Sequence, residues 1–420
     1  QLPRHCTINT FFNDMMGGYI IGPYLNEYYN GHDDEFHRQV ADVDARIQLV
    51  MDLRRGKQLK VFPYTVNGNT TWYAPTDIMP DSAVAPADRQ YMQNVFSLIY
   101  QEALAGNMAS VGNIADKMLR YQHKNAGSSL PSGMQTRAER LYNAVPFATI
   151  LFMLNLGMGF ATLFAVLWLM TRPTRRTLRG SMLMKIAVAV MLLSFAALTL
   201  CVALRWLIRG TAPMANGYET MLLMALIIMA ASLLLCRRFA IVLTFGFIMS
   251  GFFLLVSHIS QMDPQITHIM PVLQSPLLSI HVSVIMTAFA LLSLTFICGI
   301  TALLLRAMRG SRAEGLAAQL AALHALSQLF YYPAMAALAV GIFVGAVWAN
   351  VSWGTYWSWD AKEVWALITF MVYAAAAHGT SLPMMRRPMP WHVFMVAAFA
   401  TILMTYFGVN YFLGGMHSYA

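Results

Sequence analysis

Residues 279–305 read SIHVSVIMTAFALLSLTFICGITALLL, an apolar stretch without a charged side chain. Because about 20 helical residues cross the ~30 Å hydrocarbon core of a bilayer, this stretch predicts a membrane-spanning helix. Similar stretches predict eight spans in all, at 145–170, 182–208, 217–236, 239–258, 279–305, 332–350, 363–382 and 391–413. We therefore expect an all-α polytopic membrane protein of about eight transmembrane helices, with an N-terminal extracytoplasmic mixed α/β domain.

The composition divides the chain into two parts. Of the 420 residues, 58% are hydrophobic and only 11% are charged, whereas soluble domains are about 25% charged. Residues 1–144 carry 14 acidic and 13 basic residues, and residues 145–420 carry 5 acidic and 15 basic residues. This pattern predicts a soluble domain over 1–144 and a basic membrane domain over 145–420, and it excludes a single soluble domain. We attribute the net positive charge to membrane topology and expect no nucleic-acid partner.

The basic residues predict the orientation. Twelve of the 15 in the membrane domain fall on one side of the expected spans: Arg172, Arg175, Arg176, Arg179, Lys185, Arg237, Arg238, Arg306, Arg309, Arg312, Arg386 and Arg387. Positively charged loops face the cytoplasm, so the soluble domain, the loops 259–278 and 350–362 and the C-terminus are expected outside. A segment of 144 residues needs help to cross a membrane, so we expect the chain to be part of a longer polypeptide. Residues 310–330 predict an amphipathic helix on the inner surface before the sixth span.

The soluble part carries mixed signals. Apolar periodicity predicts helices over 34–54 and 88–104, and VFPYTVNGNTTWYAP at 61–75 predicts two strands joined by an Asn-Gly turn. Residues 127–133 are typical of a linker. A metal at His32 and the acidic residues 33–35 is less favoured than a solvated acidic turn. We find no catalytic constellation here and expect the domain to dock a partner or the rest of the assembly.

Five of the nine tryptophans lie between residues 348 and 365, in one outer loop. One interpretation is an aromatic belt at the lipid interface, but a belt distributes its aromatic residues over both interfaces. The other interpretation is a flat apolar surface for a large planar ligand, and the crowding favours it. The sequence leaves open whether Asp360, Lys362 and Glu363 fix this loop or contact the ligand.

A family resemblance emerges from these residues. The run Trp353–Glu363, WGTYWSWDAKE, resembles the tryptophan-rich WWD signature of haem-handling proteins, most closely the CcsA (ResC) family of System II cytochrome c biogenesis. Ala361 stands where many members have proline. Residues 216–220 (NGYET) and the ending 407–419 (FGVNYFLGGMHSY) resemble two further segments of that family. Residues 1–144 more weakly resemble the outer part of its ResB (CcsB) partner, which suggests a ResB–ResC (CcsBA) type of fusion.

Two histidines are candidate iron ligands. His281 and His417 flank the tryptophan loop at the outer ends of their spans, and two imidazoles can hold a haem iron from opposite faces. The resemblance implies the same outer axial pair. It also implies an inner haem-entry histidine at His378. His258 and His268 match no ligand position, and His324 or His392 could replace the missing inner partner of His378.

The resemblance further implies a haem platform and its supports. The platform comprises Trp353, Tyr356, Trp357, Trp359, Asp360, Lys362, Glu363 and Trp365. Asn216, Tyr218 and Glu219 are expected to brace the site, and we expect no residue to act as a catalytic acid or base.

The resemblance implies a holocytochrome c synthase, a haem lyase and haem exporter of the bacterial inner membrane. Haem b would be its substrate, and apocytochrome c with a Cys-x-x-Cys-His segment and a ResB-like portion would be its partners. Residues 1–144, the WWD loop 348–365 and the C-terminus would then lie in the periplasm. A b-type electron-transfer cytochrome, a CcmC- or CcmF-type haem chaperone, and a plain transporter or scaffold are the alternatives. The first is disfavoured because no span carries two histidines at its middle.

Overall fold

The structure is a computed structural model that describes residues 7–13, 18–32, 34–77, 84–171, 182–259, 265–266, 275–309 and 315–413. The chain forms two compact units, Gln1–Ser132 and Gly133–Ala420. Helix α5, Gly133–Ala144, belongs to the second unit because it packs on α7, Met182–Arg209. The Gln135 amide, for example, donates to the Leu207 and Ile208 carbonyls at 3.4 Å. The second unit therefore begins earlier than the composition indicates.

The first unit mixes helices with two small antiparallel strand pairs. Its described elements are η1 (Ile8–Phe11), β1 (Phe12–Asn13), β2 (Gly18–Tyr19), α1 (Gly22–Tyr29), α2 (Glu35–Arg54), β3 (Phe62–Val66), β4 (Asn69–Tyr73), α3 (Pro86–Leu104), α4 (Met108–Asn125) and η2 (Gly127–Ser129). The predicted helices over 34–54 and 88–104 are confirmed as α2 and α3.

The predicted strand–turn–strand is also confirmed. Strands β3 and β4 pair from Phe62 opposite Tyr73 to Val66 opposite Asn69. Asn67 and Gly68 both have positive φ, as a two-residue hairpin turn that matches the strand twist requires. Against this hairpin α3 and α4 bury a small core of Phe62, Val84, Met92, Val95 and Ile114.

The acidic turn before α2 is a helix cap. The Asp34 carboxylate accepts the His37 backbone N–H at 2.9 Å and lies 2.7 Å from His37 Nδ1. The other ring nitrogen of His37 lies 3.0 Å from the Glu27 carboxylate, so one imidazole joins α1 to α2. The described residues contain no group of three or more side chains suited to a metal.

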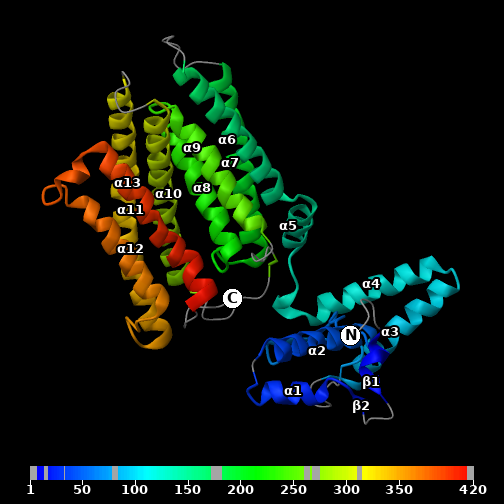
Figure 1. The fold of residues 1–420 in the computed structure, drawn as a ribbon. Helices are drawn as coiled ribbons and strands as arrows, with labels where there is room; N and C mark the ends of the chain where they lie inside the picture. The colour runs from blue at the N-terminus through cyan, green and yellow to red at the C-terminus, as the bar shows by residue number, and fades with distance from the viewer. Residues whose placement is uncertain are drawn as a thin grey trace. The chain divides into compact units, whose positions relative to one another are not determined.

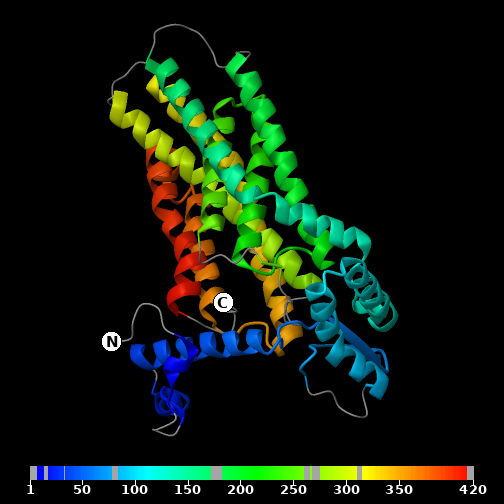
Figure 2. The ribbon, with the colours of Figure 1, turned by 90° about the vertical axis from the view of Figure 1, so that its right-hand side faces the viewer.

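The second unit is a helical bundle (Figures 1 and 2). Beyond α5 and α7 its described elements are α6 (Phe147–Thr171), α8 (Gly217–Leu235), α9 (Ile241–His258), α10 (Pro276–Arg309), α11 (Leu316–Trp353), α12 (Ala361–Ala377), η4 (Pro383–Arg386), α13 (Pro388–Leu403) and the π-helix η5 (Met404–Leu413). In the described chain seven helices are long and apolar enough to cross a membrane. The remaining expected crossing, 363–382, corresponds to α12, which has only 17 residues.

One predicted element is wrong. The separate helix predicted over 310–330 is not found in its described part, because residues 316–330 are the first turns of a helix that continues without a break to Trp353. Leu316, Leu320, Leu323 and Phe330 are buried in the bundle core, and this packing carries the helix through Pro333. At 1.5 Å per residue the 38 residues of α11 extend about 57 Å, longer than a ~30 Å hydrocarbon core.

Close helix packing holds the bundle together. Lipid tails are as apolar as leucine, so membrane helices associate through small residues that let their backbones approach. A Cβ added at any of six glycines would lie under 3.0 Å from an atom of another helix; these are Gly159, Gly246, Gly251, Gly299, Gly341 and Gly345. Two of them, Gly341 and Gly345, lie on α11 and face α10, so these two helices approach closely along that contact.

The two ionic partners of His37 predict a pH optimum for the α1–α2 pair. Hydrogen bonds to Glu27 and then to Asp34 raise the His37 pKa, so this stabilisation is lost as the pH rises through that raised value. Hydrogen bonds from the backbone and ring of His37 lower the Asp34 pKa, so that contribution is lost as the pH falls through the lowered value. We expect amide-exchange protection of α1 and α2 to be greatest between about pH 4 and 6.5, the ordinary values of the two groups. The variant His37→Gln should flatten the profile, and an unchanged profile would contradict this account.

Candidate functional site

The tryptophan loop joins the end of α11 to the start of α12 (Figure 1). Trp348 is buried, and its ring packs edge-on against Trp353 with a centroid distance of 4.9 Å. Trp357 and Trp359 pack edge-on at 6.0 Å. Tyr356 and Trp359 are 61% and 74% exposed. The loop therefore has a packed aromatic base and two outward rings.

The acidic residues of this loop bind its own backbone. Asp360 caps α12 by accepting the Lys362 N–H at 2.9 Å. The Glu363 carboxylate accepts the backbone N–H groups of Ser358 at 2.8 Å and Asp360 at 3.2 Å. This reciprocal arrangement is a capping box. The sequence left open whether these carboxylates fix the loop or contact a ligand, and the hydrogen bonds show that both fix the loop.

Trp359 has a strained backbone. Its φ is +60°, a left-handed conformation that is an outlier for a bulky side chain. Such strain costs about 1–3 kcal/mol and concentrates at functional sites, where the surrounding structure imposes it. Here the Glu363 carboxylate accepts the backbone N–H groups of Ser358 and Asp360, the residues on either side of Trp359. The loop thus keeps a large exposed indole in a conformation that glycine would adopt more easily.

His281 lies on the fifth candidate span, near the start of α10. Its Nδ1 lies 2.8 Å from the Gly341 carbonyl of α11. Gly341, Gly345 and Trp348 are spaced at helical intervals, so they share the face of α11 that contacts α10. His281 of α10 therefore packs against the face of α11 that also carries Trp348, the buried base of the tryptophan loop.

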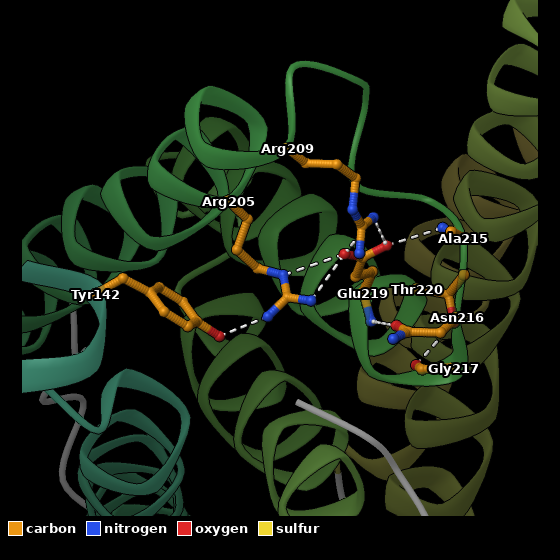
Figure 3. A network of polar contacts seen from close by, with 8 residues as sticks. All are labelled: Tyr142, Arg205, Arg209, Ala215, Asn216, Gly217, Glu219 and Thr220. Carbon is orange, nitrogen blue, oxygen red and sulfur yellow. Dashed lines mark hydrogen bonds and ion pairs between the residues drawn. The ribbon is translucent and has the colours of Figure 1, made fainter. Parts of the chain in front are cut away.

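A second glutamate-centred network lies where α7 ends and α8 begins (Figure 3). Glu219 is fully buried, and its carboxylate accepts Arg205 Nη2 at 2.8 Å and lies 2.7 Å from Arg209 Nη1. Arg205 in turn donates to the Tyr142 hydroxyl of α5 at 2.6 Å, and its guanidinium lies 4.9 Å from the Tyr218 ring centre. Removing one partner of a buried ion pair costs about 3–5 kcal/mol because the other charge is left unpaired, so we expect truncation of Glu219 or Arg205 to be strongly destabilising.

The same glutamate also organises the loop before α8. Asn216 caps α8 by accepting the Glu219 N–H at 3.0 Å, while Glu219 accepts the Ala215 N–H at 2.8 Å. This arrangement parallels the one at the start of α12. One network of α5, α7 and α8 therefore includes all three predicted supports, Asn216, Tyr218 and Glu219.

The C-terminal π-helix is tied to both neighbouring helices. The Tyr406 hydroxyl lies 2.6 Å from Thr220 Oγ1 of α8 and donates to the Gly217 carbonyl at 3.3 Å. Thr405 Oγ1 lies 2.8 Å from Thr369 Oγ1 and donates to the Trp365 carbonyl of α12 at 3.2 Å. Through these contacts η5 joins the α8 segment to the helix that follows the tryptophan loop.

The other histidines occupy varied positions. His378 is exposed and caps the C-terminal end of α12. His324 and His392 lie together, with ring centres 6.1 Å apart, and His258 Nδ1 lies 3.2 Å from Thr149 Oγ1. His417 and His268 fall outside the described residues.

Some residues of these networks escape the sequence analysis. Arg205 and Arg209 are not singled out there, although an arginine at the end of an apolar helix indicates a buried partner. The pattern Asn/Asp-x-x-Glu before an apolar run, present at 216–219 and 360–363, could have indicated both capping arrangements. Thr220 and Tyr406 give no comparable signal, because only the fold brings them together.

Comparison with known proteins decides the family. A family model described as "Cytochrome C assembly protein" matches residues 214–417. Cytochrome c biogenesis protein CcsA of Synechococcus sp. (strain CC9311) is 33% identical over 53% of this chain and 84% of its own length. The chain belongs to the CcsA family of cytochrome c assembly proteins.

Two other similar proteins cover different lengths. Protein NrfI of Wolinella succinogenes is 30% identical over 92% of this chain, and the chain spans only 42% of NrfI. A solved structure of the cytochrome c heme lyase CcmF has a TM-score of 0.44 and 18% identity, covering 62% of this chain and 45% of that one.

CcsA-family membership assigns a broad role to the bundle. This chain is a multi-pass membrane protein of the cytochrome c assembly family. The family match begins at residue 214 and ends at residue 417. It therefore includes the α8 cap, the tryptophan loop and every histidine proposed to bind iron.

The strain at Trp359 predicts opposite effects on stability and on haem binding. The variant Trp359→Gly adopts the positive φ without steric cost, so we expect an unchanged or higher melting temperature. It also removes an exposed indole, so bound haem, measured by the Soret absorbance of the purified protein, should fall. The variant Leu413→Ala, which removes an exposed apolar side chain outside the loop, is the control. Loss of stability in Trp359→Gly would contradict the strain, and full haem content would contradict the platform.

Proposed function

We propose that this chain binds haem b as substrate on the tryptophan loop, with His281 and His417 as axial ligands, and promotes its attachment to apocytochrome c. The observation that carries the proposal is the arrangement around α11. The helix accepts a hydrogen bond from the His281 ring at Gly341 and ends in the packed tryptophans 348 and 353. Gly345, beside the ring, precedes Trp353 by eight residues, which is about 12 Å of helix. One element therefore supports both the ligand and the platform.

The chemistry needs orientation more than acid–base catalysis. Each thiol of a Cys-x-x-Cys-His segment adds across one haem vinyl group, forming a C–S and a C–H bond as the S–H and the vinyl π bond are lost. No electron acceptor is required for this addition. Holding the reactants in place makes the step effectively unimolecular, which can contribute several kcal/mol. The fixed loop with its caps at Asp360 and Glu363 suits this role, because its geometry is set before the substrate arrives.

The tryptophan loop also suits the protection of ferrous haem. Aromatic rings exclude water from one porphyrin face, and two imidazoles would occupy both axial positions of the iron. The haem-binding apocytochrome then supplies its own histidine, which displaces one of the two protein ligands. Trp353, Tyr356, Trp357, Trp359 and Trp365 would form the platform, with Lys362 at its rim.

Haem is proposed to enter from the cytoplasmic side near His378. The twelve basic residues of the membrane domain predict which loops face the cytoplasm. His378 is exposed at the C-terminal end of α12, whereas the tryptophan loop precedes the N-terminal end of that helix. The protein then lies in the bacterial inner membrane, with residues 1–144, the WWD loop and the C-terminus in the periplasm. The partner of His378 would come from a ResB-like portion, and the family's fusion with ResB is part of this proposal.

The axial pair is tested by single substitutions. We expect His281→Ala and His417→Ala each to lose most of their bound haem and their yield of holocytochrome c in co-expression. Added imidazole should partly restore both, because it can supply the missing ligand. His258→Ala is the control, since His258 is also expected outside and pairs with Thr149. If both variants keep normal haem content and yield, the outer-site assignment fails.

The entry role of His378 predicts a different outcome. The variant His378→Ala should carry less haem when expressed in cells, while the haem that remains has the unaltered spectrum of the outer site. Ferric haem added to the purified variant should bind as in the parent, because the outer ligands are intact. Normal loading in cells would indicate that His378 only ends α12. Loss of the outer spectrum would instead show that it acts on the outer site.

A further inference from the structure

Helix α11 forms a cradle for the His281 imidazole, made by two glycines one turn apart. The Gly341 carbonyl lies 2.8 Å from His281 Nδ1. A Cβ placed on Gly345 would lie 2.5 Å from His281 Cε1, 2.6 Å from Nδ1 and 3.2 Å from Nε2. The imidazole therefore occupies the space that any other residue at position 345 would fill.

The hydrogen bond selects the tautomer of the ring. A carbonyl oxygen only accepts, so the proton of a neutral His281 ring must be on Nδ1. The lone pair is then on Nε2, and this is the nitrogen that would bind the iron in the proposed site. Histidines that bind metals usually donate their other N–H to a carboxylate or a backbone carbonyl, which fixes the ring and makes it a stronger donor. His281 has this arrangement through the backbone of α11.

The cradle is more specific than ordinary helix packing. Gly341 also lies next to Ile285, one turn along α10, where an added Cβ would meet Cδ1 at 2.6 Å. The contact between Gly341 and Ile285 is of the ordinary kind, in which a glycine makes room for an apolar side chain of the neighbouring helix. At Gly345 the neighbour is the ring of a candidate ligand, and Trp348 follows on the same face. The two glycines thus fix the distance between α10 and α11 at the ligand.

We propose that Gly345 and the Gly341 carbonyl are the positioning groups of the outer haem site, and that they hold His281 with Nε2 directed to iron. This inference rests on the proposed function, because it assigns a partner to the proposed ligand. It adds that α11 sets both the orientation and the donor strength of that ligand. Both glycines contact the His281 ring, and we assign them a role that acts through it.

The first test substitutes the cradle and leaves the ligand in place. We expect Gly345→Ala to lower the affinity of the purified full chain for ferric haem about 10–100-fold, the usual effect of disturbing a ligand's supporting group. Its absorption spectrum should lose the signature of two nitrogen ligands. The matched control is Gly299→Ala, also in a contact of α10, where the added Cβ would meet Val396 at 2.6 Å. The control should lower the melting temperature and leave haem affinity and spectrum unchanged.

The second test measures the hydrogen bond without relying on a crowded helix contact. The variant His281→Gly is loaded with ferric haem in the presence of imidazole, 4-methylimidazole or 1-methylimidazole. The first two keep an N–H for the Gly341 carbonyl, and the third has none. Because this hydrogen bond strengthens the donor and favours ferric iron, we expect a higher midpoint potential with 1-methylimidazole than with the other two. 4-Methylimidazole controls for the size of the methyl group.

The outcomes separate this inference from the function on which it rests. If His281→Gly binds haem like the parent without added imidazole, the proposed outer site fails and α11 has no ligand to position. If His281→Gly loses haem while Gly345→Ala keeps the parent affinity and spectrum, the cradle is overturned and the outer site stands. Equal potentials with all three imidazoles would overturn the role of the Gly341 carbonyl.

Discussion

The demand that every buried backbone group find a hydrogen-bond partner governs this molecule. Inside an apolar membrane core only helices satisfy that demand within one segment, and the second unit is built from them. Partners from outside the helix are needed where a helix begins, because its first N–H groups have no partner within it. At the starts of α8 and α12 the chain meets it with an Asn or Asp cap and a glutamate three residues later. These two starts are also where the family signatures lie.

The two capped starts serve different neighbours. At α8, Glu219 forms ion pairs with two arginines of α7, and one of them, Arg205, also donates to Tyr142 of α5. At α12, the contacts of Glu363 among the described residues are to the loop itself, at Ser358 and Asp360 on either side of the strained Trp359. The first arrangement supplies rigidity between helices, and the second supplies shape within a loop. The π-helix contacts α8 through Tyr406 and α12 through Thr405, so hydrogen bonds connect the regions of both helix starts.

The sequence predicts the helices well because long apolar stretches have few alternatives. It predicts that His281 lies near a helix end and that the tryptophans cluster around one loop, and it predicts the strand pair of the first unit from Asn67-Gly68. It fails at residues 310–330, because amphipathic periodicity does not distinguish a helix on a membrane surface from the first turns of a longer buried one. It also misses Gly341 and Gly345, since their role depends on which helix faces them. Contacts of this kind become visible only when α10 and α11 are packed together.

The winding of η5 has a consequence for how this region tolerates change in chain length. A π-helix closes its hydrogen bonds over five residues, one more than an α-helix, and residues 404–413 keep that wider winding for ten residues. Removal of one residue, or a return to the ordinary winding, would each change the rotation along this stretch and therefore the direction of the side chains that follow it. Tyr406 and Thr405, anchored to α8 and α12, stand before most of that turn. The number of residues in the tail is therefore constrained as well as their identity, because the deletion of one residue would reorient the side chains on its C-terminal side.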